Sequence, residues 1–307
     1  MSTAADASAT SAAATTSAGA AIVAKPPGVL KVAFRLWRTR SGALIALALS
    51  IVAIFGRYVA PYGEQKGIAK AFQPAAKTRL PSKFGSAKVG HDVWTRFLYG
   101  GRPILIAAIL STILALVIGT VIGLAAAYNR RKLDGFLMRT MDIVLALPQI
   151  ITALVVLSML GAKTYLIILT VGLSTVPRIA RVVRGAAVSV VERDFIGAAE
   201  ALGESRTRIL FSELLPNVAA PLLVEANLRL TFAIGLISGI SFLGFTPDLG
   251  AANWGLMINE NRGGIISNHW GVTLPVLAVA LLTVSTGLIG DGISRAAAGL
   301  DRQKDEA

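Results

Sequence analysis

Six long runs of apolar residues constrain this chain more than any other feature of its 307 residues. A helix rises 1.5 Å per residue, so roughly 20 apolar residues cross the ~30 Å hydrocarbon core of a bilayer. Runs of that length lie at 41–60, 103–128, 138–160, 165–183, 218–245 and 271–289. The sequence therefore predicts an all-α, polytopic membrane protein with six transmembrane helices, one in each run.

The composition supports this class and excludes others. Hydrophobic residues make up 54% of the chain and charged residues 15%, whereas a soluble domain has roughly a quarter of charged residues. There is no cysteine and there are two histidines, so neither a thiol site nor a histidine-rich metal site is expected. Since membrane proteins concentrate Lys and Arg in cytoplasmic segments, we interpret the net charge of +13 as a topology signal rather than as nucleic-acid binding.

Basic residues gather in the short loops of one side. They are Arg130, Arg131 and Lys132 after the second run, and Arg178, Arg181 and Arg184 at the end of the fourth. The loop 161–164, expected on the other side, carries only Lys163. The positive-inside rule therefore places both termini in the cytoplasm. The loop 61–102 departs from this rule, because it is expected outside yet carries eight Lys and Arg.

The runs divide the chain into four parts. Residues 1–34 are expected to form a disordered cytoplasmic tail, because residues 1–24 are mostly Ala, Ser and Thr. The first transmembrane helix and an external loop follow in 35–102. A five-helix core is predicted for 103–294, and a C-terminal cytoplasmic tail for 295–307.

The cytoplasmic segment 195–217 has the pattern of two short helices. Its first apolar residues recur at helical spacing and predict a narrow stripe: Phe195, Ala198, Ala199 and Leu202. Gly203 follows as a C-cap in the left-handed conformation, and a second helical piece over about 205–214 is predicted to end before Pro216. An amphipathic helix lying on the bilayer surface would show the same spacing.

This segment resembles the EAA loop of bacterial importer permeases, which reads Glu-Ala-Ala, three residues, Gly and, further on, Ile-Leu-Pro. Ala198 and Ala199 match the two alanines and Gly203 the glycine, whereas Gly197 stands where the family usually has glutamate. The resemblance implies that the segment is the loop that couples to ATPases. Its residues are Phe195, Gly197, Ala198, Ala199, Glu200, Leu202, Gly203, Leu215 and Pro216.

Further segments resemble the permeases of dipeptide and oligopeptide importers. They are 90–102 (Gly-Arg-Asp…Ser-Arg…Tyr-Gly-x-Arg in the family), 138–148, 240–245, 253–255 and 287–292. His91 replaces the arginine of the first motif, and Gly85-Ser86-Ala87 lacks the acid of the preceding Gly-Thr-Asp. From about residue 35 to 302, the chain is thus identified as a C-type permease subunit of the bacterial dipeptide/oligopeptide/nickel ABC importer family.

The resemblance implies a type I ABC importer permease fold, a location in the bacterial plasma (inner) membrane and a set of partners. These are a homologous second permease subunit, two cytoplasmic ATP-binding subunits and an external solute-binding protein, besides membrane lipid. ATP and Mg are expected on the ATP-binding subunits, because this chain has no Gly-x-x-x-x-Gly-Lys-Ser/Thr phosphate loop. We expect no cofactor, catalytic site or enzymatic activity in the chain itself. Peptides or similar small solutes are the expected substrates; a secondary transporter or channel-like protein not driven by ATP is the alternative.

Several charged residues lie within or beside the runs. Glu225 and Arg229 are spaced i, i+4 in the fifth run and are expected to neutralise each other, with a role in the pathway as the alternative. Asp142 is expected to pair with Arg139, and Asp291 to lie at the membrane interface.

The missing glutamate of the EAA loop suggests a substitute nearby. Glu200 lies on nearly the same helical face as Gly197, one turn later. We expect it either to pair with Arg206 or Arg208 across the Gly203 turn, or to be a solvated charge.

Overall fold

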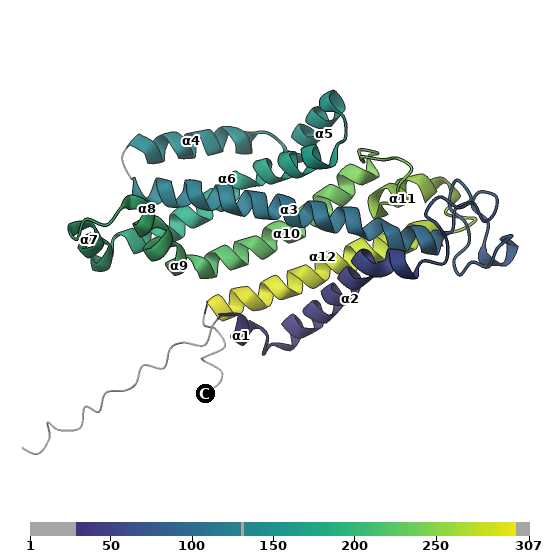
Figure 1. Cartoon of the computed structure of the whole chain (residues 1–307), viewed down its shortest axis with the longest axis horizontal. Coiled ribbons are helices and arrows are strands. Elements are labelled where there is room, and N and C mark those ends of the chain that lie inside the picture. The colour runs from purple at the N-terminus through teal and green to yellow at the C-terminus, as the bar shows by residue number, and fades with distance from the viewer. Residues whose placement is uncertain (1–28, 130–131, 299–307) are drawn as a thin grey trace, which may run out of the picture.

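The computed structural model describes residues 29–129 and 132–298, which are mostly helical (Figure 1). The long helices are α2 (Trp37–Val59), α3 (Val93–Tyr128), α4 (Lys132–Ala146), α5 (Gln149–Leu160), α6 (Thr164–Val191), α10 (Ala219–Phe242) and α12 (Trp270–Ala297). Short helices are α1 (Val29–Ala33), α7 (Asp194–Ala201), α8 (Arg206–Arg208), α9 (Leu215–Asn217) and α11 (Trp254–Asn261). The described part of the chain is all-α, as predicted.

Five of the helices in the described residues are long and apolar enough to cross a membrane alone: α2, α3, α6, α10 and α12. The expected span 138–160 is instead broken into α4 and α5, which meet at an angle of 77°. Pro148 explains the break, because proline lacks an N–H donor and disfavours helical conformation in the residue before it. The six-span fold is reached when this bent pair counts as one span.

Two helices extend beyond their predicted limits. Helix α3 begins at Val93, ten residues before the apolar run, because Asp92 caps it: the Asp92 carboxylate accepts from Thr95 N at 2.8 Å and from Thr95 Oγ1 at 2.7 Å. Helix α12 continues to Ala297, so Asp291 is an exposed residue within a helix and not at its end.

The terminal tails are therefore shorter than predicted. Residues 29–33 form helix α1, which packs beside α12, and residues 295–297 belong to α12 itself. The rest of the two expected tails, 1–28 and 299–307, lies outside the described residues.

Helices α3 and α6 form the centre of the bundle, with α2 and α12 on one side and α4 and α5 on the other (Figure 1). Glycines allow the close approach of α3 to α6. A Cβ on Gly119 would lie 2.7 Å from Ile179 Cβ, and one on Gly123 would lie 2.6 Å from Ala180 O. The bend between α4 and α5 borders a cavity of about 550 Å³, whose walls come from α3 to α6 and are mainly apolar.

Candidate functional site

Helix α7 and the turns after it lie at one end of the bundle (Figure 1). Gly203 ends α7 with a φ of +76°, the left-handed conformation expected of it. The turn is closed by Gly203 N donating to Glu200 O at 3.0 Å and by Glu204 N donating to Ala199 O at 3.1 Å. These bonds satisfy carbonyls that the helix end would otherwise leave without partners.

The second helical piece differs from the prediction. Ser205 caps α8, a π-helix follows over Ile209–Leu214, and α9 carries the chain through Pro216 to Asn217. The wider π turn offers a physical reason, since Pro216 cannot donate the bond of a regular α-helical turn. The segment therefore passes Pro216 instead of ending before it.

Most of the apolar stripe of α7 faces away from the protein, whereas Ala199 is half-buried against the interior. Ile196 is the residue that is buried, with 2% exposure, in a cluster with Ile209 and Leu214. Leu202 is 82% exposed and Phe195 37% exposed. Two large side chains of the predicted stripe thus form an uncovered apolar surface at this end of the bundle, which we call the α7 surface (Phe195 and Leu202).

Glu200 has a partner that the sequence did not suggest. Tyr128 Oη, at the end of α3, donates to Glu200 Oε1 at 2.6 Å. The expected pairing with Arg206 or Arg208 is wrong, because Arg208 Nε lies 3.5 Å from Glu204 Oε2 instead. Glu204 and Arg208 have the i, i+4 spacing that favours such a pair on a helix.

Tyr128→Phe removes the hydroxyl that holds Glu200 and should loosen α7. A hydrogen bond to a charged group contributes about 1.5 kcal/mol, so we expect amide exchange in α7 to accelerate roughly tenfold, as measured by hydrogen–deuterium exchange. Glu200→Ala should have a similar effect, and Glu200→Gln, which keeps an acceptor oxygen, a smaller one. Additive effects in the Tyr128→Phe/Glu200→Ala double variant would contradict the pairing.

Two ion pairs join α4 to α6. Arg184 Nε and Nη2 donate to the two carboxylate oxygens of Asp134, each at 2.6 Å. Arg181 pairs with Asp142. The expected pair of Asp142 with Arg139 is therefore wrong, because α6 runs beside α4 and brings an arginine from another helix within reach.

Glu225 and Arg229 pair within α10. Arg229 Nε donates to Glu225 Oε1 at 2.6 Å, and Glu225 is 4% exposed. Each charge neutralises the other where water is excluded, which lowers the cost of placing them in a membrane span.

A buried tryptophan locks α11 onto α3 at the other end of the bundle. Trp254 is fully buried, and its Nε1 donates to Phe97 O at 2.8 Å. It fills a slot above Gly101, where a Cβ would lie 2.4 Å from the Trp254 ring. Asn253 caps α11 by accepting from Gly255 N at 3.0 Å. The Asn253-Trp-Gly255 motif thus fixes the position of α11.

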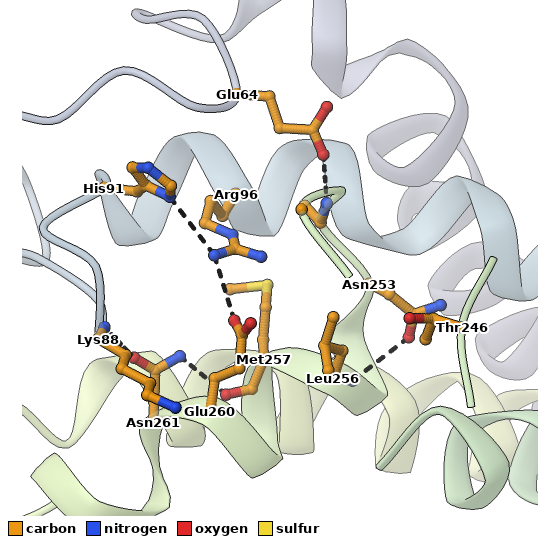
Figure 2. Close-up of polar contacts among 12 residues, drawn as sticks. Glu64, Lys88, His91, Arg96, Thr246, Asn253, Leu256, Met257, Glu260 and Asn261 are labelled. Atoms are coloured by element: carbon orange, nitrogen blue, oxygen red, sulfur yellow. Dashed lines mark hydrogen bonds and ion pairs between the residues drawn. The ribbon is translucent and has the colours of Figure 1, made fainter. Parts of the chain in front are cut away.

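Arg96 lies at the centre of a polar cluster between α3 and α11 (Figure 2). It is 2% exposed, and its Nη1 lies 3.1 Å from Glu260 Oε2 of α11 and 3.5 Å from His91 Nδ1. Glu64, from the loop after α2, accepts a hydrogen bond from Ala252 N. The cluster joins three segments of the chain, and the sequence signal for it was the 90–102 motif, which contains both His91 and Arg96.

The surroundings of His91 in this cluster lower the pKa of its imidazole. Burial and then the charge of Arg96 lower the pKa of His91, and Glu64 opposes them. With a folded-state pKa below the unfolded one, the unfolded chain binds more protons between the two values, so stability rises with pH there. Acidification through the ordinary range of histidine therefore weakens the packing of loop, α3 and α11.

The profile of the family described as "Binding-protein-dependent transport system inner membrane component" matches residues 119–298, more than half of the chain. The chain belongs to this family. It is a multi-pass membrane protein, and the resemblance to dipeptide- and oligopeptide-type permeases is confirmed by its relatives.

Two of these relatives are peptide transport permeases from different bacteria. The dipeptide transport system permease protein DppC of Alkalihalophilus pseudofirmus is 33% identical over 82% of this chain and 82% of its own length. The peptide transport system permease protein SapC of Escherichia coli O6:H1 is 29% identical over 89% of this chain and 95% of its own. A chain of the MetNI methionine ABC transporter, in an inward-facing form, matches with a TM-score of 0.52 and 21% identity, over 64% of this chain and 93% of that one. The last match confirms the importer permease fold.

Proposed function

We propose that this chain forms half of the translocation pathway of an ATP-driven importer for peptides or similar small solutes, and that α7 transmits the movement of the ATPases to it. The α7 surface carries this proposal. Leu202 and Phe195 are large apolar side chains that the described chain leaves uncovered, while Ile196 anchors the same helix. A helix that is fixed on one side and apolar on the other suits a groove in a partner protein.

The proposed complex contains a second, homologous permease, two ATP-binding subunits that hold ATP and Mg, and an external solute-binding protein. Open glycine positions on α10 support a permease partner: a Cβ on Gly235 or Gly239 would meet no atom within 4 Å. Small residues on an uncovered face let the helix of a partner approach closely in a membrane. Purification of the tagged chain with both ATP-binding subunits tests this composition.

The proposed mechanism is a rigid-body switch. Closure of the ATPases would move α7 and, through the Tyr128–Glu200 bond, the end of α3, so that the bundle alternates between inward-open and outward-open states. Uptake in proteoliposomes that lack the ATP-binding subunits, driven by an ion gradient alone, would favour a secondary transporter instead.

The proposed orientation places α7 and both termini in the cytoplasm. Because the chain has no cysteine, single cysteines report topology without background. We expect Ser205→Cys to react with an impermeant maleimide only in inside-out vesicles, and Lys83→Cys only in right-side-out vesicles. Reaction of both from the same side would contradict the six-span topology.

A further inference from the structure

Helix α6 carries three arginines at intervals of three residues, in the half that leads to α7: Arg178, Arg181 and Arg184. The last two are neutralised by α4. Arg184 donates to both carboxylate oxygens of Asp134, and Arg181 pairs with Asp142. Both charges are therefore balanced within the protein.

The first of the three arginines has no such balance. Arg178 Nη1 donates to the neutral amide oxygen of Gln149 at 3.1 Å, and Gln149 Nε2 donates onward to Thr175 Oγ1 at 3.1 Å. No carboxylate within residues 29–129 and 132–298 forms an ion pair with Arg178. A guanidinium has five N–H donors, so most of them stay available to an anion.

This unbalanced charge lies at the depth of the hydrocarbon. Arg178 is 14 residues from Thr164, the start of α6, which is about 21 Å along a hydrocarbon core of about 30 Å. A charge without a counter-charge is costly there. The long side chain can extend towards the headgroup phosphates on the α7 side of the membrane.

The cavity at the bend between α4 and α5, which we call the bend cavity, lies beside Arg178. Pro177, the residue before Arg178, lines it, and so do residues on both sides of Gln149, namely Leu147 and Thr152. Figure 1 shows α4 and α5 at an angle to each other on this side of the bundle. The Gln149–Arg178 contact therefore stands next to a hollow at the same bend.

The bend cavity suits a hydrocarbon chain. Its volume of about 550 Å³ is in the range of small-molecule sites, about 300–1,000 Å³. Met141 and Val176 are buried lining residues, whereas Leu169 and Leu173 are exposed, so the cavity opens at the surface of the bundle. Apolar cavities exclude water and take up apolar molecules, and at this depth the surrounding medium is lipid.

We propose that the bend cavity binds one acyl chain of an anionic phospholipid whose phosphate pairs with Arg178. The phosphate accepts charge-assisted hydrogen bonds from the guanidinium and supplies the counter-charge that α4 supplies to the other two arginines. With α7 in the cytoplasm, as proposed above, this lipid belongs to the cytoplasmic leaflet, where anionic lipids attract cations.

The test uses the chain together with its co-purifying subunits, in nanodiscs with equal amounts of phosphatidylglycerol and phosphatidylcholine of identical acyl chains. Native mass spectrometry counts the lipids that stay bound after release. For the wild type we expect one phosphatidylglycerol per copy of this chain, retained about tenfold over phosphatidylcholine, whose choline cation offsets its phosphate. Arg178→Gln should abolish this preference, and Arg178→Lys should keep it.

The double variant Arg181→Gln/Asp142→Asn is the matched control, because it neutralises the neighbouring ion pair without changing the net charge. It should retain both lipids as the wild type does. Leu173→Trp fills the mouth of the cavity and should lower the retention of both lipids about fivefold. Leu44→Trp, at an exposed position of α2, should leave retention unchanged.

A further variant identifies the occupant. Because the chain has no cysteine, Thr152→Cys can carry a single photoreactive benzophenone, which should cross-link to lipid. A cross-link to a second protein chain would overturn the proposal. So would a wild type that retains neither lipid or both equally, or an undiminished preference in Arg178→Gln. Uptake by the wild type tests the proposed function separately, because that function does not require a lipid at this site.

Discussion

Leu202→Asp is expected to abolish the stimulation of ATP hydrolysis by substrate in the reconstituted importer. The side chain is 82% exposed in this chain, so the substitution costs the fold almost nothing. In a groove of the ATPase it would lose about 2 kcal/mol of apolar burial and add an unpaired carboxylate, which costs at least as much again. We therefore expect coupling to fall by about a hundredfold or more, with normal insertion and an unchanged thermal midpoint of the isolated permease pair.

Leu249→Asp is the matched control. Leu249 is 63% exposed and lies near α11, at the opposite end of the bundle from α7. The same chemical change there should leave coupling near the wild-type level. Full stimulation by substrate in Leu202→Asp would show that the α7 surface does not contact the ATPase.

The spans were predictable because hydrocarbon selects for length and apolarity, which are local properties of the sequence. Their interruptions were less visible. Pro148 and Gln149 stand between two apolar stretches, so the run 138–160 looked continuous although the backbone turns by 77°. Conversely, Arg96 and the glycines before Pro103 made 93–102 look like a loop, although capping by Asp92 and burial of Phe97 make it helical.

The polar partners show where sequence reasoning stops. Spacing along one helix identified Glu225 with Arg229, and the need for a left-handed residue identified Gly203. The partners of Asp142 and Glu200 lie 39 and 72 residues away, on helices whose relative rotation no local pattern encodes. In both cases the sequence pointed to the nearest opposite charge along the chain, whereas helix packing brings a different residue within hydrogen-bond distance.

Gly197 departs from the family's EAA loop, which usually has glutamate at this position. A Cβ at this position would meet no atom within 4 Å, so the structure gives no steric reason for glycine in place of the family's glutamate. The site has room for the glutamate, and nothing in the structure explains its absence.

Glu260→Leu is expected to destabilise the protein by about 3–5 kcal/mol, because it removes the carboxylate from a guanidinium that is only 2% exposed. A neutral leucine has the volume to fill the space but cannot balance the buried charge of Arg96. The measurement is the free energy of unfolding of the permease in detergent, by denaturant titration. Asp142→Leu serves as the control: the Arg181–Asp142 pair is half exposed, and exposed pairs contribute roughly 0–1 kcal/mol.

The double variant Arg96→Met/Glu260→Leu separates the charge from the packing. Replacing a buried ion pair by apolar side chains of similar volume is often neutral, so the second substitution should recover most of the stability that the first one removed. On acidification, the double variant should also lose less stability than the wild type, because the Arg96 charge that lowers the pKa of His91 is gone. If Glu260→Leu alone were as stable as the wild type, Arg96 would have to be neutralised by water or by another group, and the ion pair would not hold α11 to α3. If instead the double variant were less stable than Glu260→Leu, the stem of Arg96 would contribute packing that methionine cannot replace.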